Sequence, residues 1–242
     1  NLRDASEIGY VGQDPESQIV TDKVWHELAF GLENLGCSVG EINRRVSEMA
    51  SYFGIQTWFR KDTCELSGGQ KQLLNLAAVM AMHPKAIILD EPTSQLDPVA
   101  ASEFLNTLRR INQELGTTIV ITEHRLEEVF PMADQVLLME DGRLLFQGTP
   151  QETVRFVARA QKEELRELLP APVRICMQVQ PDCAAIPLTV REGRLWLTET
   201  VKEPQIRHLE RPKAETPVQD TAIYMEEVWF RYTRQGEDVL RG

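Results

Sequence analysis

Residues 66–70 read Leu-Ser-Gly-Gly-Gln, and residues 86–92 read Ala-Ile-Ile-Leu-Asp-Glu-Pro. The serine and glycines of the first stretch open a helix, which would offer backbone N–H groups and a hydroxyl to phosphate oxygens. The second stretch is an apolar strand that ends in two carboxylates, Asp90 and Glu91. One suits magnesium, and the other suits the polarisation of a water molecule.

The segments around these two stretches alternate between strand and helix patterns. Residues 8–11, 86–89 and 117–122 are expected to be strands, the last of them buried, and Asp141-Gly142 predicts the turn of a hairpin over 135–147. Apolar spacing and capping signals predict helices over 24–35, 42–53, 71–82, 99–115 and 126–132. This alternation indicates an α/β fold with a doubly wound parallel sheet.

The pattern changes after Pro150. Residues 151–169 predict one charged amphipathic helix, and 173–179 a short strand. A capping box at 189–192 predicts a helix that runs through Leu197. The polar, proline-containing stretch 202–221 is typical of a linker, and 222–242 returns to a strand pattern.

Composition limits the class of protein. The 242 residues are 42% hydrophobic, enough for a packed core, and carry a formal net charge of −11. That charge disfavours a general nucleic-acid binder, which needs a basic face. No run of eighteen apolar residues is present. The four cysteines form no C-x-x-C pair, so reduced thiols are favoured over a zinc site.

On these residues the chain resembles the ATPases of ATP-binding-cassette (ABC) transporters. Residues 66–70 resemble the signature motif, 86–91 the Walker B strand and 94–98 the D-loop. The resemblance implies a P-loop NTPase (RecA-like) fold with a helical subdomain over about 21–82 and ATP and Mg²⁺ as cofactors. Without it, residues 66–70 are an ordinary loop-to-helix junction and Asp90-Glu91 a solvent-facing acidic pair.

The resemblance assigns roles at the signature and the Walker B strand. Ser67, Gly68, Gly69 and Gln70 correspond to residues that contact the γ-phosphate of ATP held by the opposite cassette. Asp90 would help to position Mg²⁺. Glu91 would be the general base that orients the attacking water.

Three further residues gain roles from the resemblance. His124 stands where the family places a histidine that senses the γ-phosphate. It lies in the tripeptide Glu-His-Arg, a variant of the commoner Thr-His-Asp. Gln13 corresponds to the Q-loop glutamine that contacts Mg²⁺ and couples nucleotide state to the transmembrane partner. Asp97 would link one ATP site to the other, and it also suits the N-cap of the following helix. A lone histidine or a loop glutamine is ordinarily without function.

Two segments after Gln13, residues 17–19 and 29–36, resemble the corresponding segments of the energy-coupling-factor (ECF) branch of the family. That branch powers uptake of vitamins, cobalt or nickel. The implied partners are an integral-membrane scaffold subunit and a substrate-capture subunit, at the cytoplasmic face of the membrane. No nucleic-acid partner is expected.

The end of the chain resembles the opening strands of a second cassette, with Tyr232 as the residue that stacks on adenine. A strand with alternating aromatics is the plain alternative. The expected organisation is a first cassette over 1–150, a linker region over 151–221 and the start of a second cassette over 222–242, as in fused two-cassette ATPases.

The phosphate-binding motif G-x-x-x-x-G-K-[ST] does not occur in the 242 residues. We therefore expect the sequence to be an N-terminally truncated fragment of a longer protein, which by itself binds ATP weakly and does not hydrolyse it. Two other functions stay open: a non-transport ABC ATPase that acts on ribosomes or DNA, and a catalytically inactive interaction module. The mixed charge of 202–221 counts against the first.

Overall fold

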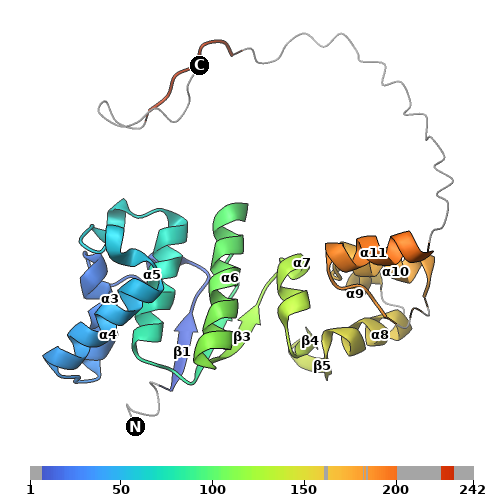
Figure 1. Cartoon of the computed structure of the whole chain (residues 1–242), viewed down its shortest axis with the longest axis horizontal. Coiled ribbons are helices and arrows are strands. Elements are labelled where there is room, and N and C mark those ends of the chain that lie inside the picture. Colours follow the sequence, from blue (N-terminus) through green and yellow to red (C-terminus); the bar gives the residue numbers. More distant parts are fainter. Residues whose placement is uncertain (1–6, 161–162, 182, 184, 201–224, 232–242) are drawn as a thin grey trace. The chain divides into compact units, whose positions relative to one another are not determined.

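The structure, a computed structural model, describes residues 7–160, 163–181, 183, 185–200 and 225–231. The chain divides into two compact units, residues 1–200 and 201–242. All helices and strands of the described residues belong to the first unit (Figure 1). The predicted division into 1–150, 151–221 and 222–242 stays a prediction.

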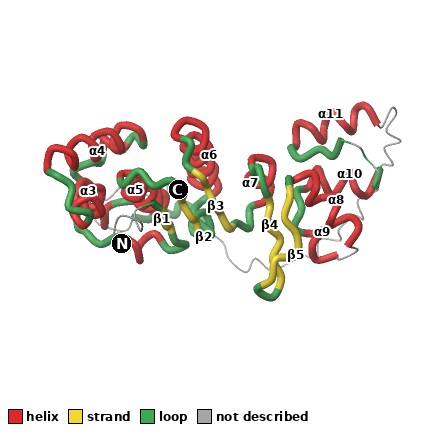
Figure 2. Tube along the Cα trace, turned by 90° about the horizontal axis from the view of Figure 1, so that it is seen from below, coloured by secondary structure: helices red, strands yellow, loops and turns green. Residues whose placement is uncertain are grey.

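A parallel three-stranded sheet forms one side of the main core of the first unit. Its strands are β1 (Ile8–Val11), β2 (Ala86–Asp90) and β3 (Thr118–Thr122), in the order β1-β2-β3. The register pairs Val11 with Leu89 and Leu89 with Ile121. The three strands lie side by side (Figure 2), and their register brings their carboxyl ends to one edge.

The two faces of this sheet differ in burial. Helices α5 (Gly68–Ala81) and α6 (Pro98–Leu115) contact β1 and β3 respectively, and Ile87 and Leu89 of β2 are fully buried. At Gly9 an added Cβ would stand 2.2 Å from a Val79 side-chain carbon, so the approach of α5 to β1 requires glycine.

Three residues that pair with one another across the strands are exposed on the opposite face: Tyr10 by 53%, Ile88 by 41% and Val120 by 45%. The strand predicted over 117–122 is confirmed, but the prediction that it is buried is wrong, because β3 alternates between exposed and half-buried residues. Its β-branched residues predicted the strand and said nothing of what covers it.

A helical region connects β1 to β2. It consists of α2 (Pro15–Gln18), α3 (Val24–Asn34), α4 (Val39–Tyr52), two 3₁₀ turns (Ile55–Thr57, Thr63–Glu65) and α5. Helix α3 packs against α4 and α5, with Leu28 and Leu32 fully buried (Figure 1). The helices predicted over 24–35, 42–53 and 71–82 are confirmed within a few residues at their ends.

A hairpin and four helices follow β3 and the short turns α7 (Leu126–Val129) and η3 (Phe130–Met132). Strands β4 (Val136–Glu140) and β5 (Arg143–Gly148) are antiparallel, and Asp141 and Gly142 have φ of 49° and 73°, as a type I′ turn requires. The helices are α8 (Pro150–Ala160), α9 (Glu163–Glu167), α10 (Ala171–Val179) and α11 (Val190–Thr200).

One prediction for this region is wrong. Residues 173–179 form a helix and not a strand, because Val173 and Met177, four residues apart, meet a small core at helical spacing. Helices α8 and α9 both lie within 151–169, and residues 161–162 between them lie outside the described residues, so the single helix predicted there stays a prediction. The capping box at 189–192 is confirmed, since Glu192 N donates to Thr189 Oγ1 and Thr189 N donates to Glu192 Oε2.

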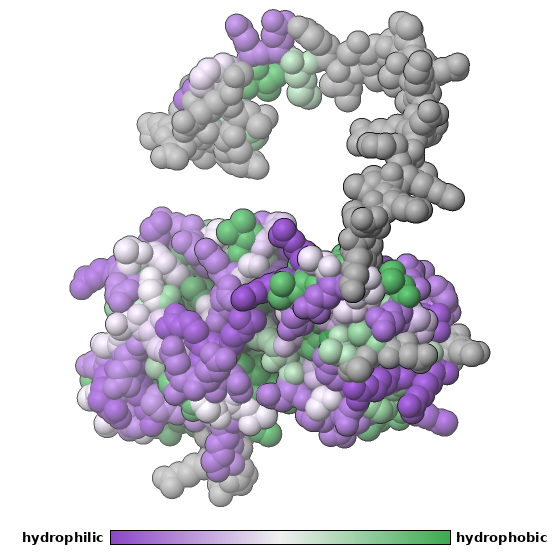
Figure 3. Space-filling model, turned by 45° about the vertical axis from the view of Figure 1, so that its right-hand side comes forward, coloured by the Kyte–Doolittle hydropathy of each residue, from purple (hydrophilic) through white to green (hydrophobic). Residues whose placement is uncertain are grey.

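Within the second unit, residues 225–231 form no strand longer than one bridge residue, and the predicted linker 202–221 and Tyr232 lie outside the described residues. In the part of the chain that is described, no helix has the length and hydrophobicity needed to cross a membrane. Hydrophilic residues cover most of the described surface seen in Figure 3, and hydrophobic residues show in smaller areas.

Candidate functional site

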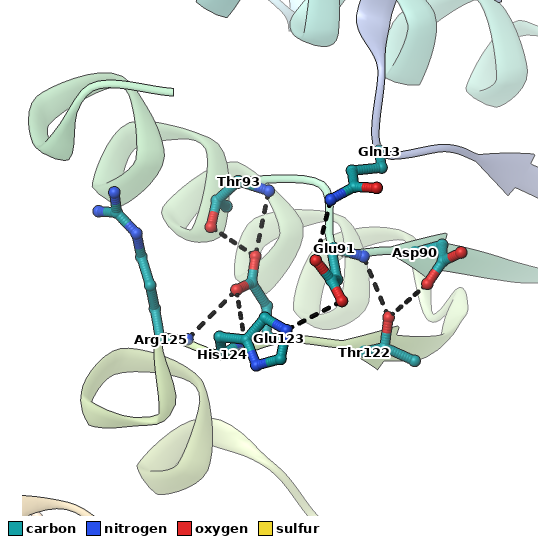
Figure 4. Close-up of polar contacts among 8 residues, drawn as sticks. All are labelled: Gln13, Asp90, Glu91, Thr93, Thr122, Glu123, His124 and Arg125. Carbon is teal, nitrogen blue, oxygen red and sulfur yellow. Dashed lines mark hydrogen bonds and ion pairs between the residues drawn. The ribbon is translucent and has the colours of Figure 1, made fainter. Parts of the chain in front are cut away.

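The polar edge of the sheet brings together four residues predicted from the sequence. Gln13 follows β1, Asp90 ends β2, Glu91 comes next, and His124 follows β3. Because parallel strands place their carboxyl ends at the same edge, residues far apart in the sequence meet there (Figure 4).

Glu91 is the centre of this cluster. Gln13 Nε2 donates to its Oε2 at 3.0 Å, and His124 Nε2 lies 2.9 Å from its Oε1. The Glu91 backbone has a φ of 44°, in the left-handed region that disfavours non-glycine residues. Its N–H donates to the Thr122 carbonyl at 3.1 Å and to Thr122 Oγ1 at 3.0 Å. The Glu91 backbone is therefore strained, and both oxygens of its carboxylate are held by residues that follow the two neighbouring strands.

Asp90 keeps one oxygen available. Thr122 Oγ1 donates to Asp90 Oδ1 at 2.7 Å, and no protein donor reaches Oδ2 among the described residues. Within those residues no cluster of three or more His, Cys, Asp or Glu side chains could hold a metal alone. Mg²⁺ is commonly bound by one or two protein oxygens together with substrate phosphates and water, and Asp90 with the Gln13 amide oxygen fits that mode.

The signature residues form the start of α5. Ser67 is the N-cap: its Oγ accepts from Gln70 N at 3.3 Å, and its own N–H donates to Gln70 Oε1 at 3.0 Å. A Cβ on Gly68 would meet nothing within 4 Å, whereas one on Gly69 would stand 3.0 Å from Ala100 Cβ. No hydrogen bond between described residues joins 67–70 to Asp90, Glu91 or His124, so the structure does not join them into one site.

A shallow groove of about 470 Å³ runs between the start of α5 and α6. It is lined by Ser67, Gly69 and Gln70 from the signature, by Ala100, Glu103, Phe104, Asn106, Thr107 and Arg110 from α6, and by Phe53 and Leu73. Polar side chains of α6 thus lie close to the exposed start of α5.

Asp97 caps α6, as the sequence predicted. Its Oδ1 accepts from Val99 N at 2.9 Å and from Ala100 N at 3.0 Å. A role for Asp97 between two ATP sites stays a prediction.

Sequence reasoning missed two residues that join the loops of this edge. Gln72 is fully buried in α5, and its Nε2 donates at 3.0 Å to the carbonyls of Gly12 and Pro92, next to Gln13 and Glu91. A glutamine within the apolar run of α5 was the available signal. In the sequence, Glu123 is only the first residue of the variant tripeptide Glu-His-Arg. In the structure it accepts hydrogen bonds from Thr93, His124 and Arg125 (Figure 4).

A charged pair links the segment after Gln13 to α5. Lys71 forms an ion pair with Glu16 of α2 and lowers the pKa of that carboxyl group through the hydrogen bond and the attraction of the charges. Asn75 Nδ2 donates to the Pro15 carbonyl at 2.9 Å. Helix α5 therefore holds α2 at two points beside the polar edge.

Comparison with known proteins gives consistent results. The family model described as "ABC transporter" matches residues 3–94. The chain is 42% identical over 241 residues to a protein of Bacillus thuringiensis subsp. konkukian described as an ABC transporter ATP-binding protein, covering 100% of the chain and 42% of that relative. It therefore spans less than half the length of this curated relative.

Two other proteins are also similar to the chain. An energy-coupling factor transporter ATP-binding protein of Methanospirillum hungatei is 40% identical over 145 residues, covering 60% of the chain and 36% of the relative. The solved structure of cbiO1 from Clostridium perfringens, described as part of the ABC transporter complex cbiONQ, is 34% identical. It aligns with a TM-score of 0.59 and covers 79% of the chain and 68% of its own.

Proposed function

The chain belongs to the ABC transporter ATP-binding protein family, and on that premise we propose that it supplies part of an ATP-hydrolysing site that energises a membrane importer. The observation that carries the proposal is the Glu91 carboxylate, which His124 and Gln13 hold from the two neighbouring strand ends. A carboxylate fixed in this way can orient one water molecule for attack on a phosphoryl group.

We propose that Glu91 is the general base and that its neighbours fix its direction. The Glu91 side chain is 30% exposed, so water reaches it, while its two oxygens are bonded from opposite sides. Asp90, with one oxygen available, and the Gln13 amide oxygen would hold Mg²⁺, which supplies positive charge to the phosphate oxygens.

Ser67, Gly68, Gly69 and Gln70 act on an ATP held by a second cassette in this proposal. Support comes from their place at the N-terminus of α5, where the N–H groups of Gly68 and Gly69 lack carbonyl partners within the helix and attract anions. Asp97, at the start of α6, would carry the state of one site to the other.

The importer type and partners are a further part of the proposal. The energy-coupling factor relative and the cbiONQ component support an ECF-type complex with an integral-membrane scaffold subunit and a substrate-capture subunit, for a vitamin, cobalt or nickel. The length of the Bacillus relative leaves room for two fused cassettes, with Tyr232 in the second. We place the protein at the cytoplasmic face of the membrane.

The test uses the intact protein that carries this sequence. Glu91→Gln keeps the size of the side chain and removes the base, so we expect kcat for ATP hydrolysis to fall by about 100-fold or more while ATP still binds. Glu163→Gln, an exposed change in α9, should leave turnover unchanged. Equal turnover of the Glu91→Gln variant and the parent would refute the role of Glu91. Uptake of cobalt, nickel and a vitamin panel by cells with and without the protein tests the importer class.

A further inference from the structure

Glu123 forms a four-donor junction at the polar edge. Its Oε1 accepts from Thr93 N at 3.1 Å and from Thr93 Oγ1. Its Oε2 accepts from His124 N at 3.0 Å and from Arg125 N at 3.3 Å. Both oxygens are therefore used, and each binds a different loop or segment (Figure 4).

The two groups of donors belong to the two loops that carry Glu91 and His124. Thr93 is fully buried and stands two residues after Glu91, in the loop that follows β2. His124 stands directly after Glu123, in the loop that follows β3. Glu123 therefore ties together the two backbone segments that carry the partners of the 2.9 Å contact.

Arg125 extends this junction toward the next helix. Its backbone N–H binds Glu123, and its guanidinium Nη2 donates to the Leu96 carbonyl at 3.3 Å. Leu96 is buried and immediately precedes Asp97, the N-cap of α6. The segment from Glu91 to Asp97 is thus held to the loop after β3 at both Thr93 and Leu96.

We infer that Glu123 is a positioning residue for the proposed ATPase, which fixes the His124 backbone relative to Glu91 and so sets the direction of the Glu91 carboxylate. The inference rests on the proposed function. A carboxylate is required because all four partners donate. A glutamine offers one acceptor oxygen, and its NH₂ group would face donors on the other side.

The test compares Glu123→Gln with its parent in the intact protein. We expect kcat for ATP hydrolysis to fall about tenfold or more, with KM for ATP changed by less than about threefold, because misplacement of a catalytic group affects the chemical step. Thr93→Val, which removes only the hydroxyl donor, should lower kcat by a smaller factor. Glu152→Gln is the matched control, because Glu152 likewise accepts from the N–H and Oγ1 of one threonine, Thr149. It should leave kcat unchanged.

A double-mutant cycle separates positioning from a general structural role. If Glu123 acts through His124, adding Glu123→Gln to His124→Ala should lower the residual single-turnover rate by less than about twofold. The inference is overturned by a full additional loss in that background, or by a Glu123→Gln protein with normal kcat. If Glu123→Gln does not fold, Thr93→Val takes its place in the same measurements. A normal kcat for Thr93→Val, or a full additional loss when it is added to His124→Ala, then overturns the inference.

A different result would refute the proposed function. Its failure is marked by a Glu91→Gln protein that hydrolyses ATP as fast as the parent, whereas failure of the inference alone leaves Glu91 essential and Glu123 dispensable.

Discussion

At the scale of single residues, the site depends on one strained backbone position. Glu91 has a φ of 44°, which costs energy for any residue with a Cβ, and its N–H is held there by hydrogen bonds to the carbonyl and to Oγ1 of Thr122. This turn redirects the chain just after β2, so that the Glu91 carboxylate faces Gln13 and His124 while Asp90 faces Thr122.

The strain at Glu91 predicts a reversal of the usual order of glycine and alanine. Glu91→Gly should have a free energy of unfolding about 1 kcal/mol greater than Glu91→Ala, because glycine adopts positive φ without steric cost. Denaturant titration of both variants measures this difference. At Glu103, in the interior of α6, the order should be opposite, with alanine the more stable. The same order at both positions would argue against strain at Glu91.

Replacing Gln72 with leucine, a side chain of similar size, tests how much its two hydrogen bonds contribute to stability. In Gln72→Leu the carbonyls of Gly12 and Pro92 lose their buried donor, which should lower the free energy of unfolding by about 1–3 kcal/mol. Gln113→Leu, an exposed change in α6, is the control and should shift it by less than about 0.5 kcal/mol. Equal effects of the two changes would contradict the bridging role.

At the scale of elements, the two helices beside the site begin with side-chain caps that belong to candidate functional motifs. Ser67 and Gln70 form the capping box of α5, and Asp97 caps the 18-residue α6. Such caps contribute about 0.5–2 kcal/mol to a helix. The same residues therefore have a structural role whatever they contact in a second cassette.

Asparagine at position 97 separates the two roles. Asn is as good an N-cap as Asp, so Asp97→Asn should keep the free energy of unfolding within about 0.5 kcal/mol, whereas Asp97→Ala should lose about 1 kcal/mol. If Asp97 links two ATP sites through its charge, both variants should lose ATP turnover in the intact protein. Normal turnover of Asp97→Asn would limit the residue to its cap.

At the scale of the whole molecule, two separate cores hold the first unit together. One lies between the sheet and helices α3–α6, and the other joins Phe130 and helices α8 and α10. Cys176 of α10 is fully buried, and burial together with the hydrogen bond to the Cys183 thiol raises the pKa of Cys176 to about 12.

This environment predicts how the thiols react. At pH 8 the exposed Cys64 should be alkylated by iodoacetamide first, and Cys176 should resist until denaturant is added, because its thiolate form is scarce and shielded. The resistance should weaken only as the pH approaches the raised pKa. Peptide mass spectrometry follows each site with time. Equal rates at Cys64 and Cys176 in the native protein would show that the surroundings of Cys176 open readily.

Local sequence patterns are enough to predict the alternation of strands and helices, the helix caps and the strand-end positions of Gln13, Asp90, Glu91 and His124. Periodicity and capping are local, so a window of a few residues contains the information. The family features at 66–70 and 86–91 are local in the same sense. They predicted the class of fold, which the comparison with cbiO1 confirmed.

Which polar groups meet depends on the packing of elements that are distant in the sequence. Gln72 lies 60 residues from Gly12, and Glu123 lies 30 residues from Thr93. Their hydrogen bonds follow from the register of β1, β2 and β3 and from the close approach of α5 at Gly9. The strand predicted over 173–179 failed for the same reason, since burial against a second core selected a helix there. Contacts of this kind depend on how distant elements pack, and no local pattern encodes them.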